Sequence, residues 1–224
     1  MNRFKAAAIV PAYNEETTIG DIVRALVASE MFREVIVVCD GSQDRTADRA
    51  REAGATLVHA CTKNRGKGGA LAIGVRDTDA PVICFFDADL IGLTAAHITA
   101  LVDPVVRGAL AMTIGVRDRG VVTGAIARSF KIGGQRALRR EIFERLPQQC
   151  VAGYKIETAL TFFCTVQAKS YAVVTLAGLR FVRKIEKEGL FAGVIGYIKM
   201  SAQIAWAIIE CRLLRAAFLE REEK

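Results

Sequence analysis

The first half of the chain alternates between two kinds of segment, and this alternation constrains the fold more than any other feature. Residues 34–39 (EVIVVC) form a short apolar run rich in β-branched residues, which is typical of a buried strand. Residues 18–28 instead place apolar side chains at helical spacing. Strands that alternate with helices build βαβ units around a mostly parallel sheet. The sequence therefore predicts an α/β fold, with strands over 6–11, 34–39, 56–60 and 81–86 and helices over 18–28, 46–53 and 67–75.

The length of the chain fits one domain with a C-terminal extension. Its 224 residues, of which 52% are hydrophobic, can bury one substantial core. No repeat or low-complexity stretch indicates a second domain. We therefore expect a domain over 1–188 and a long amphipathic helix over 189–224.

Polar clusters follow three of the predicted strands, at the edge where open α/β sheets bind ligands. They are 11–16 (PAYNEE), 40–46 (DGSQDRT) and 64–70 (NRGKGGA). Tyr13 offers a ring that can stack on a base, while Glu15 and Asp40 can accept hydrogen bonds from a ribose or a base. Lys67 places a cation at a helix start, which suits an anion. The first two clusters also have a purely structural interpretation, as ordinary turns.

The acidic pair Asp87-Ala88-Asp89 follows the fourth predicted strand. Two carboxylates at this spacing can hold a divalent cation against a diphosphate, and oxygen ligands suit Mg²⁺ or Mn²⁺. The alternative is a strand-end turn with two solvated acids. The three preceding clusters favour the metal site, with Asp87 and Asp89 as ligands.

The chain has a formal net charge of +7, and most of the excess lies in one segment. Residues 117–145 contain eight basic and three acidic residues, an excess of +5. This charge indicates a negatively charged partner: nucleic acid, an anionic membrane surface or a phosphorylated substrate. Arg117, Gln135 and Arg136 are the candidates for binding phosphate, because guanidinium forms paired hydrogen bonds with it. We interpret three further arginines as part of a solvated helix face: Arg139, Arg140 and Arg145.

The cysteines and histidines do not indicate a metal or disulfide framework. Six cysteines are scattered without a C-x-x-C pair, as expected of reduced residues in a cytosolic protein. We expect structural roles for His59 and His97, because neither has a ligand partner at short spacing.

Together the motifs resemble those of family 2 glycosyltransferases, whose GT-A fold is a Rossmann-like, mostly parallel sheet flanked by helices. The resemblance rests on 9–16 (IVPAYNEE), Asp40-Gly41-Ser42 with Asp44 and Thr46, 64–70 and 87–89, in this order. It covers roughly the first half of the chain and favours enzymes that make polyprenyl-phosphate sugars, such as dolichyl-phosphate glucosyl- and mannosyltransferases. It implies a nucleotide-sugar half over about 1–115 and an acceptor half over about 116–188.

The resemblance also implies roles for individual residues. The nucleotide would be contacted by Pro11, Ala12, Tyr13, Glu15, Val38, Asp40 and Lys67, and by Asp87, Ala88 and Asp89. Asp89 would be the more direct metal ligand and a catalytic residue. Related enzymes often carry another polar residue shortly after the acidic pair, where this chain has Leu90-Ile91-Gly92. Further metal ligands must therefore come from elsewhere, from phosphate or from water.

On the acceptor side, 131–140 resembles the acceptor loop and strand of the polyprenyl-phosphate transferases. This makes Arg117 and Arg136 candidate catalytic residues, with Gln135 beside them. Arg183 lies in a basic stretch that resembles one closing over the nucleotide phosphates. Glu157 would orient the acceptor or act as a base, although a carboxylate at a helix start also has a structural explanation. A phosphate acceptor is already ionised and needs no strong base.

The C-terminal residues 189–219 read as one long helix. Lys199 at its middle argues against a membrane span. Two alternatives stay open: a helix lying on an anionic membrane surface, or a helix that pairs two chains as a homodimer.

The sequence thus predicts a metal-dependent transfer of a hexose from a UDP- or GDP-sugar to a polyprenyl phosphate, at the cytoplasmic face of the membrane. UDP-glucose is the favoured donor. One alternative acceptor is a soluble phosphorylated compound such as 3-phosphoglycerate. An alternative of another class is a non-catalytic regulator or scaffold that binds nucleotide sugars. We do not expect nucleic acid as a partner, because the first half lacks basic residues interleaved with aromatic ones.

Overall fold

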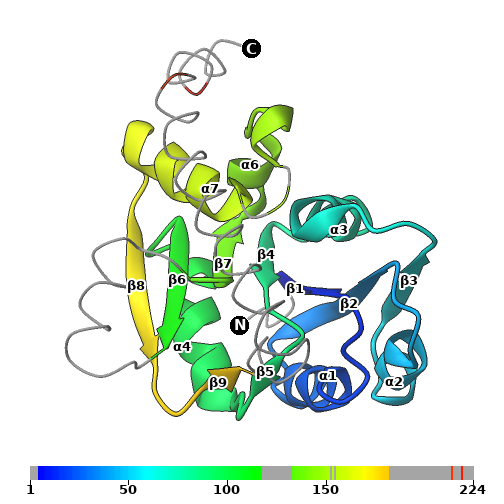
Figure 1. The fold of residues 1–224 in the computed structure, drawn as a ribbon. Helices are drawn as coiled ribbons and strands as arrows, with labels where there is room; N and C mark the ends of the chain where they lie inside the picture. Colours follow the sequence, from blue (N-terminus) through cyan, green and yellow to red (C-terminus); the bar gives the residue numbers. More distant parts are fainter. Residues whose placement is uncertain are drawn as a thin grey trace.

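A seven-stranded sheet forms the centre of the fold (Figure 1). A computed structural model describes residues 5–117, 133–151, 153, 155–181, 213 and 218. The strand order is β3-β2-β1-β4-β7-β6-β8. These strands are β1 (Ala6–Ala12), β2 (Phe32–Asp40), β3 (Leu57–Cys61), β4 (Val82–Phe85), β6 (Met112–Arg117), β7 (Gln135–Arg139) and β8 (Tyr171–Leu176). A small second sheet pairs β5 (Leu90–Ile91) with β9 (Arg180–Phe181).

The sheet is parallel except at β7. Strands β1 to β4 pair in parallel, as do β6 and β8. Strand β7 runs antiparallel to both of its neighbours, β4 and β6. The predicted α/β fold with a mostly parallel sheet is confirmed, and the reversed strand is an addition that local patterns do not reveal.

Helices cover both faces of the sheet (Figure 1). One face carries α1 (Ile19–Ala28), α2 (Thr46–Glu52) and α4 (Ala95–Val106); the other carries α3 (Gly66–Arg76), α6 (Arg140–Glu144) and α7 (Lys155–Val166). A short 3₁₀ helix, η1 (Gln148–Cys150), precedes α7. The seven elements predicted in the first half all exist, with ends within two residues of the predicted ones.

Both faces of the sheet are buried, because side chains along a strand alternate between two hydrophobic cores. In β4, Val82 and Cys84 belong to the core shared with α1 and α4, whereas Ile83 and Phe85 belong to the core shared with α3 and α7. A strand covered on both faces has no solvent side, which explains its continuous apolar sequence. Each large side chain buried in this way contributes roughly 1.5–3 kcal/mol to stability.

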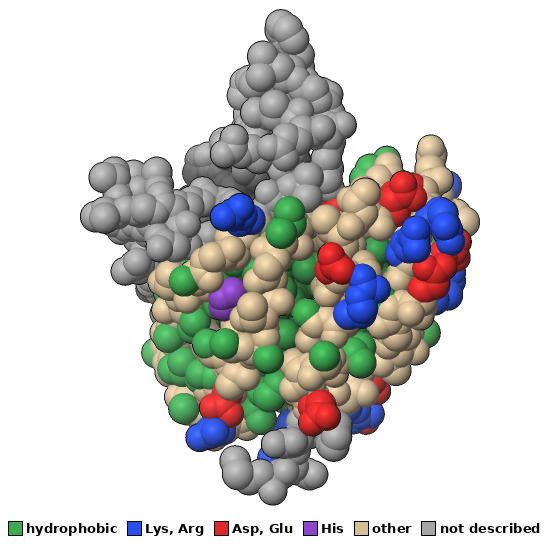
Figure 2. Space-filling model, turned by 90° about the horizontal axis from the view of Figure 1, so that it is seen from below, with side chains coloured by type: hydrophobic (Ala, Val, Ile, Leu, Met, Phe, Trp, Pro, Cys, Tyr) green, Lys and Arg blue, Asp and Glu red, His purple; other side chains and the backbone are tan. Residues whose placement is uncertain are grey.

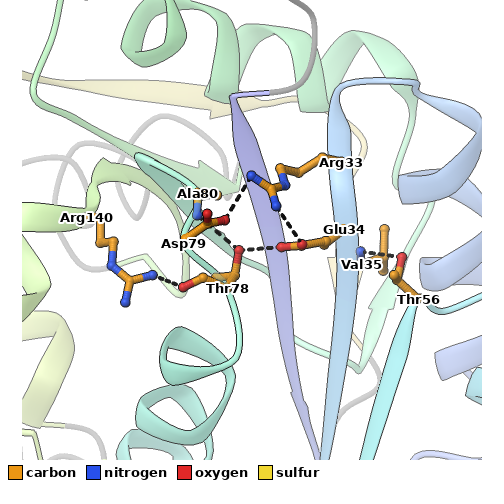
Figure 3. Close-up of polar contacts among 8 residues, drawn as sticks. All are labelled: Arg33, Glu34, Val35, Thr56, Thr78, Asp79, Ala80 and Arg140. Carbon is orange, nitrogen blue, oxygen red and sulfur yellow. Dashed lines mark hydrogen bonds and ion pairs between the residues drawn. The ribbon is translucent and has the colours of Figure 1, made fainter.

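Polar side chains close the amino-terminal edge of the sheet (Figure 3). Glu34, near the start of β2, accepts a hydrogen bond from the Thr78 hydroxyl. Arg33 pairs with Glu34 at 3.1 Å and with Asp79 at 2.9 Å. Arg140 donates to the Thr78 carbonyl. Arg140 is therefore partly buried at this edge and links the start of α6 to the loop before β4, instead of lying on a fully solvated helix face as we expected.

Charged side chains over α1 and α2 are paired with each other. Figure 2 shows acidic and basic side chains next to one another on one side of this face, while hydrophobic side chains dominate the other side. Ion pairs join Arg24 to Asp21 at 2.6 Å and Arg45 to Glu52 at 3.1 Å. Exposed pairs contribute at most about 1 kcal/mol each. The stability of the fold therefore comes mainly from the two cores.

One residue of the C-terminal segment packs on α7. Phe218 is fully buried, its ring centroid lies 5.1 Å from that of Phe162, and its carbonyl accepts a hydrogen bond from Gln167 Nε2 at 2.6 Å. Leu213 is 79% exposed. The rest of 189–224 lies outside the described residues, so the long helix stays a prediction. Within the ranges that the structure describes, no helix is both long and apolar enough to cross a bilayer.

Candidate functional site

The polar clusters found in the sequence meet at the carboxyl-terminal edge of the sheet. Strands β2, β1 and β4 are adjacent and parallel, so their carboxyl ends lie side by side. Tyr13 follows β1, Asp40 ends β2, and Asp87 lies just past β4. The first turn of α3 brings Lys67 to the same place, where it contacts Asp87. The fold therefore gathers residues from four segments into one site.

The loops after β1 and β2 hold each other by hydrogen bonds. The backbone N–H of Asn14 donates to Ser42 Oγ at 3.1 Å, and the N–H of Gln43 donates to Asn14 Oδ1 at 2.9 Å. Asn14 has φ 53°, in the left-handed region that asparagine tolerates better than most residues. This conformation leaves the Tyr13 side chain 50% exposed at the edge of the site.

Asp44 completes the link between these loops. It accepts hydrogen bonds from the backbone N–H groups of Thr46 at 3.0 Å and Glu16 at 3.2 Å, while the N–H of Glu15 donates to Thr46 Oγ1 at 2.8 Å. Partial burial opposes ionisation, but the hydrogen bonds from Thr46 and Glu16 lower the pKa of Asp44 below its ordinary value. An ionised Asp44 thus fixes both loops at neutral pH.

Asp40 anchors the loop before α3. It is 4% exposed, and its two oxygens accept from the backbone N–H of Arg65 at 2.8 and 3.0 Å. The next residue, Gly41, has φ 81°, and a Cβ there would lie 2.9 Å from Asn64 N. A carboxylate has about four lone-pair positions. Acceptance from a nucleobase is compatible with this arrangement and stays a prediction.

Lys67 bridges two carboxylates that are far apart in the sequence. Its Nζ lies 2.6 Å from Asp87 Oδ1 and 2.5 Å from Glu157 Oε1. Burial by itself would lower the pKa of Lys67, but the two carboxylates outweigh it and raise the pKa above its ordinary value. Lys67 is therefore a permanent cation at this edge of the sheet.

Close packing of backbones brings Lys67 and Glu157 together. A Cβ at Gly68 would lie 1.5 Å from the Val151 carbonyl oxygen, so only glycine lets α3 approach the segment before α7 this closely. Burial opposes ionisation of Glu157, but Lys67 and then Arg136 lower its pKa. Glu157 is thus an ionised, ion-paired carboxylate, which weakens the expectation that it acts as a base.

The residues before and at the start of β7 position Asp87. Gln135 Nε2 donates to Asp87 Oδ2 at 2.8 Å. A Cβ at Gly134 would lie 2.1 Å from the same oxygen and 3.0 Å from Lys67 Nζ. The predicted site residue Gln135 therefore contacts the acidic pair directly, and Gly134 leaves the space in which Asp87 and Lys67 meet.

Arg136 points into the core beside α7. It is 1% exposed, its Nε donates to the Gly133 carbonyl at 3.1 Å, and its Nη1 donates to Thr161 Oγ1 at 3.0 Å. Burial lowers the pKa of Arg136, and the negative charge of Glu157 opposes this shift. Arg136 is placed to stabilise ionised Glu157, while its direct contact with a phosphate stays a prediction.

Several residues assigned to the nucleotide are buried by packing. The side chains of Val38, Ala12 and Ala88 are at most 4% exposed, and Pro11 is half-buried. Glu15 is also half-buried, in the loop after β1. The contacts of these residues with a ligand stay predictions. The buried side chains pack in the core at the ends of the strands.

The acidic pair offers the ligands that Mg²⁺ and Mn²⁺ prefer. Asp87 and Asp89 supply carboxylate oxygens at a half-buried turn. In the described ranges no group of three His, Cys, Asp or Glu residues is arranged to hold a metal. Leu90, which takes the place of a further polar ligand, is 1% exposed and pairs β5 with β9. The donor set fits a divalent cation whose shell is completed by a diphosphate and water, because Mg²⁺ commonly retains waters.

Comparison with known proteins identifies the family. Residues 7–149 match the model of glycosyl transferase family 2, which is more than half of the chain. The chain belongs to glycosyltransferase family 2. The matched part of this family 2 glycosyltransferase contains the strand ends that carry Tyr13, Asp40, Lys67, Asp87 and Asp89.

Individual relatives are similar to part of this chain. An uncharacterized protein of Methanocaldococcus jannaschii is 37% identical over 92 residues, which are 40% of this chain and 37% of that protein. The 4,4'-diaponeurosporenoate glycosyltransferase of Staphylococcus aureus is 38% identical over 99 residues, which are 42% of this chain and 26% of that enzyme. Each alignment spans well under two thirds of the relative's own length.

A solved structure shares the fold. The crystal structure of glucosyl-3-phosphoglycerate synthase from Mycobacterium tuberculosis, in complex with Mn²⁺, UDP-glucose and phosphoglyceric acid, has a TM-score of 0.73. The two chains are 24% identical, and the match covers 92% of this chain and 78% of that one. The similarity confirms the predicted GT-A architecture.

Part of the predicted acceptor side of this family 2 glycosyltransferase is not described. Arg183 lies outside the described residues. Arg117 ends β6, but its side chain lies outside the described part. The predicted phosphate contacts of both arginines stay predictions.

The contacts that bring the site together carry little signal in the sequence. The glycines of 64–70 permit a close backbone approach, and a further glycine pair directly precedes Gln135. Nothing in the sequence shows what these glycines approach or links Lys67 to Glu157.

Proposed function

We propose that this family 2 glycosyltransferase moves a hexosyl group from a nucleoside-diphosphate sugar, with a UDP-sugar favoured, to a phosphorylated acceptor. The observation that carries the proposal is the position of Asp87. It lies beyond β4, held by Lys67 and Gln135, on the edge where β1 and β2 present Tyr13 and Asp40. This is the edge where open α/β sheets bind nucleotides.

The residues at the end of each strand would bind a different part of the donor. The exposed Tyr13 ring would stack on the base, and Asp40 would accept from a base N–H. Asp87 and Asp89 would hold Mg²⁺ or Mn²⁺, with Asp89 as the more direct ligand. The bound metal would neutralise charge that develops on the departing nucleoside diphosphate. Lys67 keeps a positive charge beside this position.

With a polyprenyl phosphate as acceptor, an ionised phosphate oxygen would attack the anomeric carbon as the bond from that carbon to the nucleoside diphosphate breaks, and no base is needed. With 3-phosphoglycerate the attacking group would be its hydroxyl, whose proton must pass to a nearby base or to the departing diphosphate. Glu157 is instead tied to Lys67 at 2.5 Å and stabilised by Arg136. We assign Glu157 the role of positioning the Lys67 ammonium. The candidates for holding phosphate groups are Arg117, Arg136 and Arg183.

A soluble phosphorylated acceptor such as 3-phosphoglycerate is the first candidate. It is supported by the fold shared with the M. tuberculosis synthase, which was crystallised with phosphoglyceric acid. A polyprenyl phosphate at the cytoplasmic face of a membrane is the second. It is supported by the acceptor-loop resemblance of 131–140.

A screen of donors against acceptors tests the proposal. UDP-glucose and GDP-mannose are incubated with 3-phosphoglycerate or with vesicles that contain polyprenyl phosphate, with Mn²⁺ or with EDTA. We expect a Mn²⁺-dependent glycosylated product from UDP-glucose. Product from 3-phosphoglycerate alone selects the soluble acceptor, and product only with vesicles selects the lipid. Tight UDP binding without any product would support the non-catalytic regulator instead.

A further inference from the structure

Lys67 contacts Asp87, one of the two predicted metal ligands. The ammonium lies 2.6 Å from Asp87 Oδ1 and 2.5 Å from Glu157 Oε1. All three side chains are largely buried, with exposures of 14% for Lys67, 21% for Asp87 and 16% for Glu157. The contact is therefore a sheltered ion pair on a predicted metal ligand, where solvent screens charge poorly.

The second oxygen of Asp87 is also engaged. Gln135 donates to Oδ2 at 2.8 Å, and the backbone of Gly134 packs so close that an added Cβ would lie 2.1 Å from this oxygen. A divalent cation that binds Asp87 must therefore share an oxygen with a donor that is already there, Lys67 at Oδ1 or Gln135 at Oδ2. At this spacing an ammonium and a divalent cation on the same oxygen repel each other.

Glu157 offers Lys67 a second partner. Because Lys67 contacts both carboxylates, it can release Asp87 and still keep one ion pair. An ammonium has three N–H donors. The released donor would then be available to an incoming phosphate oxygen.

We propose that Lys67 and the metal compete for Asp87. Before the nucleotide binds, the Lys67 ammonium neutralises the Asp87 carboxylate. When the metal and the diphosphate bind at Asp87, Lys67 keeps its ion pair with Glu157. The inference rests on the proposed function, because it requires a metal at the acidic pair. Lys67 is in this view a positioning residue that makes metal binding weak until the nucleotide arrives.

Mn²⁺ binding without nucleotide tests this competition. The full chain is titrated with Mn²⁺, and free Mn²⁺ is measured by its electron paramagnetic resonance signal. We expect Lys67→Met to bind Mn²⁺ roughly tenfold more tightly, the effect of removing one competing charge-assisted contact. Glu157→Gln should bind Mn²⁺ more weakly. Of the two carboxylates that Lys67 contacts, Asp87 is then the one left, so Lys67 competes more strongly with Mn²⁺ for it.

A double-mutant cycle separates competition at Asp87 from a general change in charge. Competition predicts that Lys67→Met tightens Mn²⁺ binding in the native background and has no such effect in an Asp87→Asn background. Tightening that persists with Asp87→Asn, or unchanged or weaker binding in a folded Lys67→Met, would overturn the inference. If circular dichroism shows that Lys67→Met does not fold, Lys67→Gln is judged by the same criterion. Absence of Mn²⁺ binding to the native chain, with and without UDP, would instead refute the proposed function and the inference with it.

Discussion

Substitution of Gly134 tests the geometry of the site without removing any functional side chain. In Gly134→Ala the new Cβ would lie 2.1 Å from Asp87 Oδ2, 2.9 Å from Asp87 Cγ and 3.0 Å from Lys67 Nζ. Contacts below 3.0 Å are not tolerated, so either Asp87 or the backbone at 134 must move. The hydrogen bond from Gln135 and the ion pair with Lys67 both end on the carboxylate that is displaced.

The size of the effect follows from the displacement. Ordinary contact begins near 3.4 Å, so the methyl group and Asp87 Oδ2 must separate by about 1.3 Å. A misplacement of about 1 Å costs roughly 100-fold in rate, or about 2.7 kcal/mol in the activation barrier. Overpacking costs stability by typically 1–3 kcal/mol. We expect the low end of that range, because Asp87 is 21% exposed and can shift toward solvent.

The assay compares kcat/KM of the native chain, Gly134→Ala and a control, with the donor and acceptor found by the screen. Gly20→Ala is the matched control, because a Cβ at Gly20 in α1 would meet only the flexible end of Arg24, at 3.3 Å. We expect the control to stay within about twofold, since alanine favours a helix. A folded Gly134→Ala with native kcat/KM would refute the placement of Asp87 at the reacting groups.

Two further predictions concern stability. Phe218→Ala should lower the free energy of unfolding by about 3 kcal/mol or more, because the ring is fully buried against Phe162 and Phe163. Leu213→Ala, at a 79% exposed position, should change it by less than about 0.5 kcal/mol. Equal urea denaturation curves for the two variants would contradict the packing of Phe218 on α7. The pKa of Asp44 is lower in the folded chain than in the unfolded chain, where it is about 4. The Asp44 carboxylate therefore stabilises the fold fully above about pH 4, and this contribution is lost as the pH falls through the pKa of the folded state. Asp44→Asn should therefore be less stable than the native chain at pH 7, with the difference shrinking toward pH 3; a difference independent of pH would show that the charge of Asp44 does not hold the loops.

The first half of the fold is predictable because its signals are local. Apolar runs such as 34–39 and helical spacing such as that of 18–28 act over one element, and the parallel βαβ arrangement follows from their order. The same order places Asp40 and Asp87 at one edge of the sheet, so the donor side of the site could be proposed from the sequence.

The rest of the site depends on contacts between distant residues. Lys67 and Glu157 are 90 positions apart, and their contact requires Gly68 to lie against the Val151 carbonyl. Strand β7 turns antiparallel beside β4, which carries Gln135 to Asp87 and turns Arg136 into the core. The sequence shows the charge of Arg136 but not the direction of its side chain, which only the packed structure gives. Packing, not local pattern, decides these positions.

The proposed function requires that Asp89, with Asp87, joins a divalent metal to a nucleoside diphosphate. Isothermal titration calorimetry of UDP binding, with Mn²⁺ and with EDTA, measures it directly on the native chain and on Asp89→Asn. We predict that the native chain binds UDP more tightly with Mn²⁺, and that a folded Asp89→Asn, verified by circular dichroism, loses this difference. An unchanged Mn²⁺ dependence of UDP affinity in Asp89→Asn would show that Asp89 does not bind the metal.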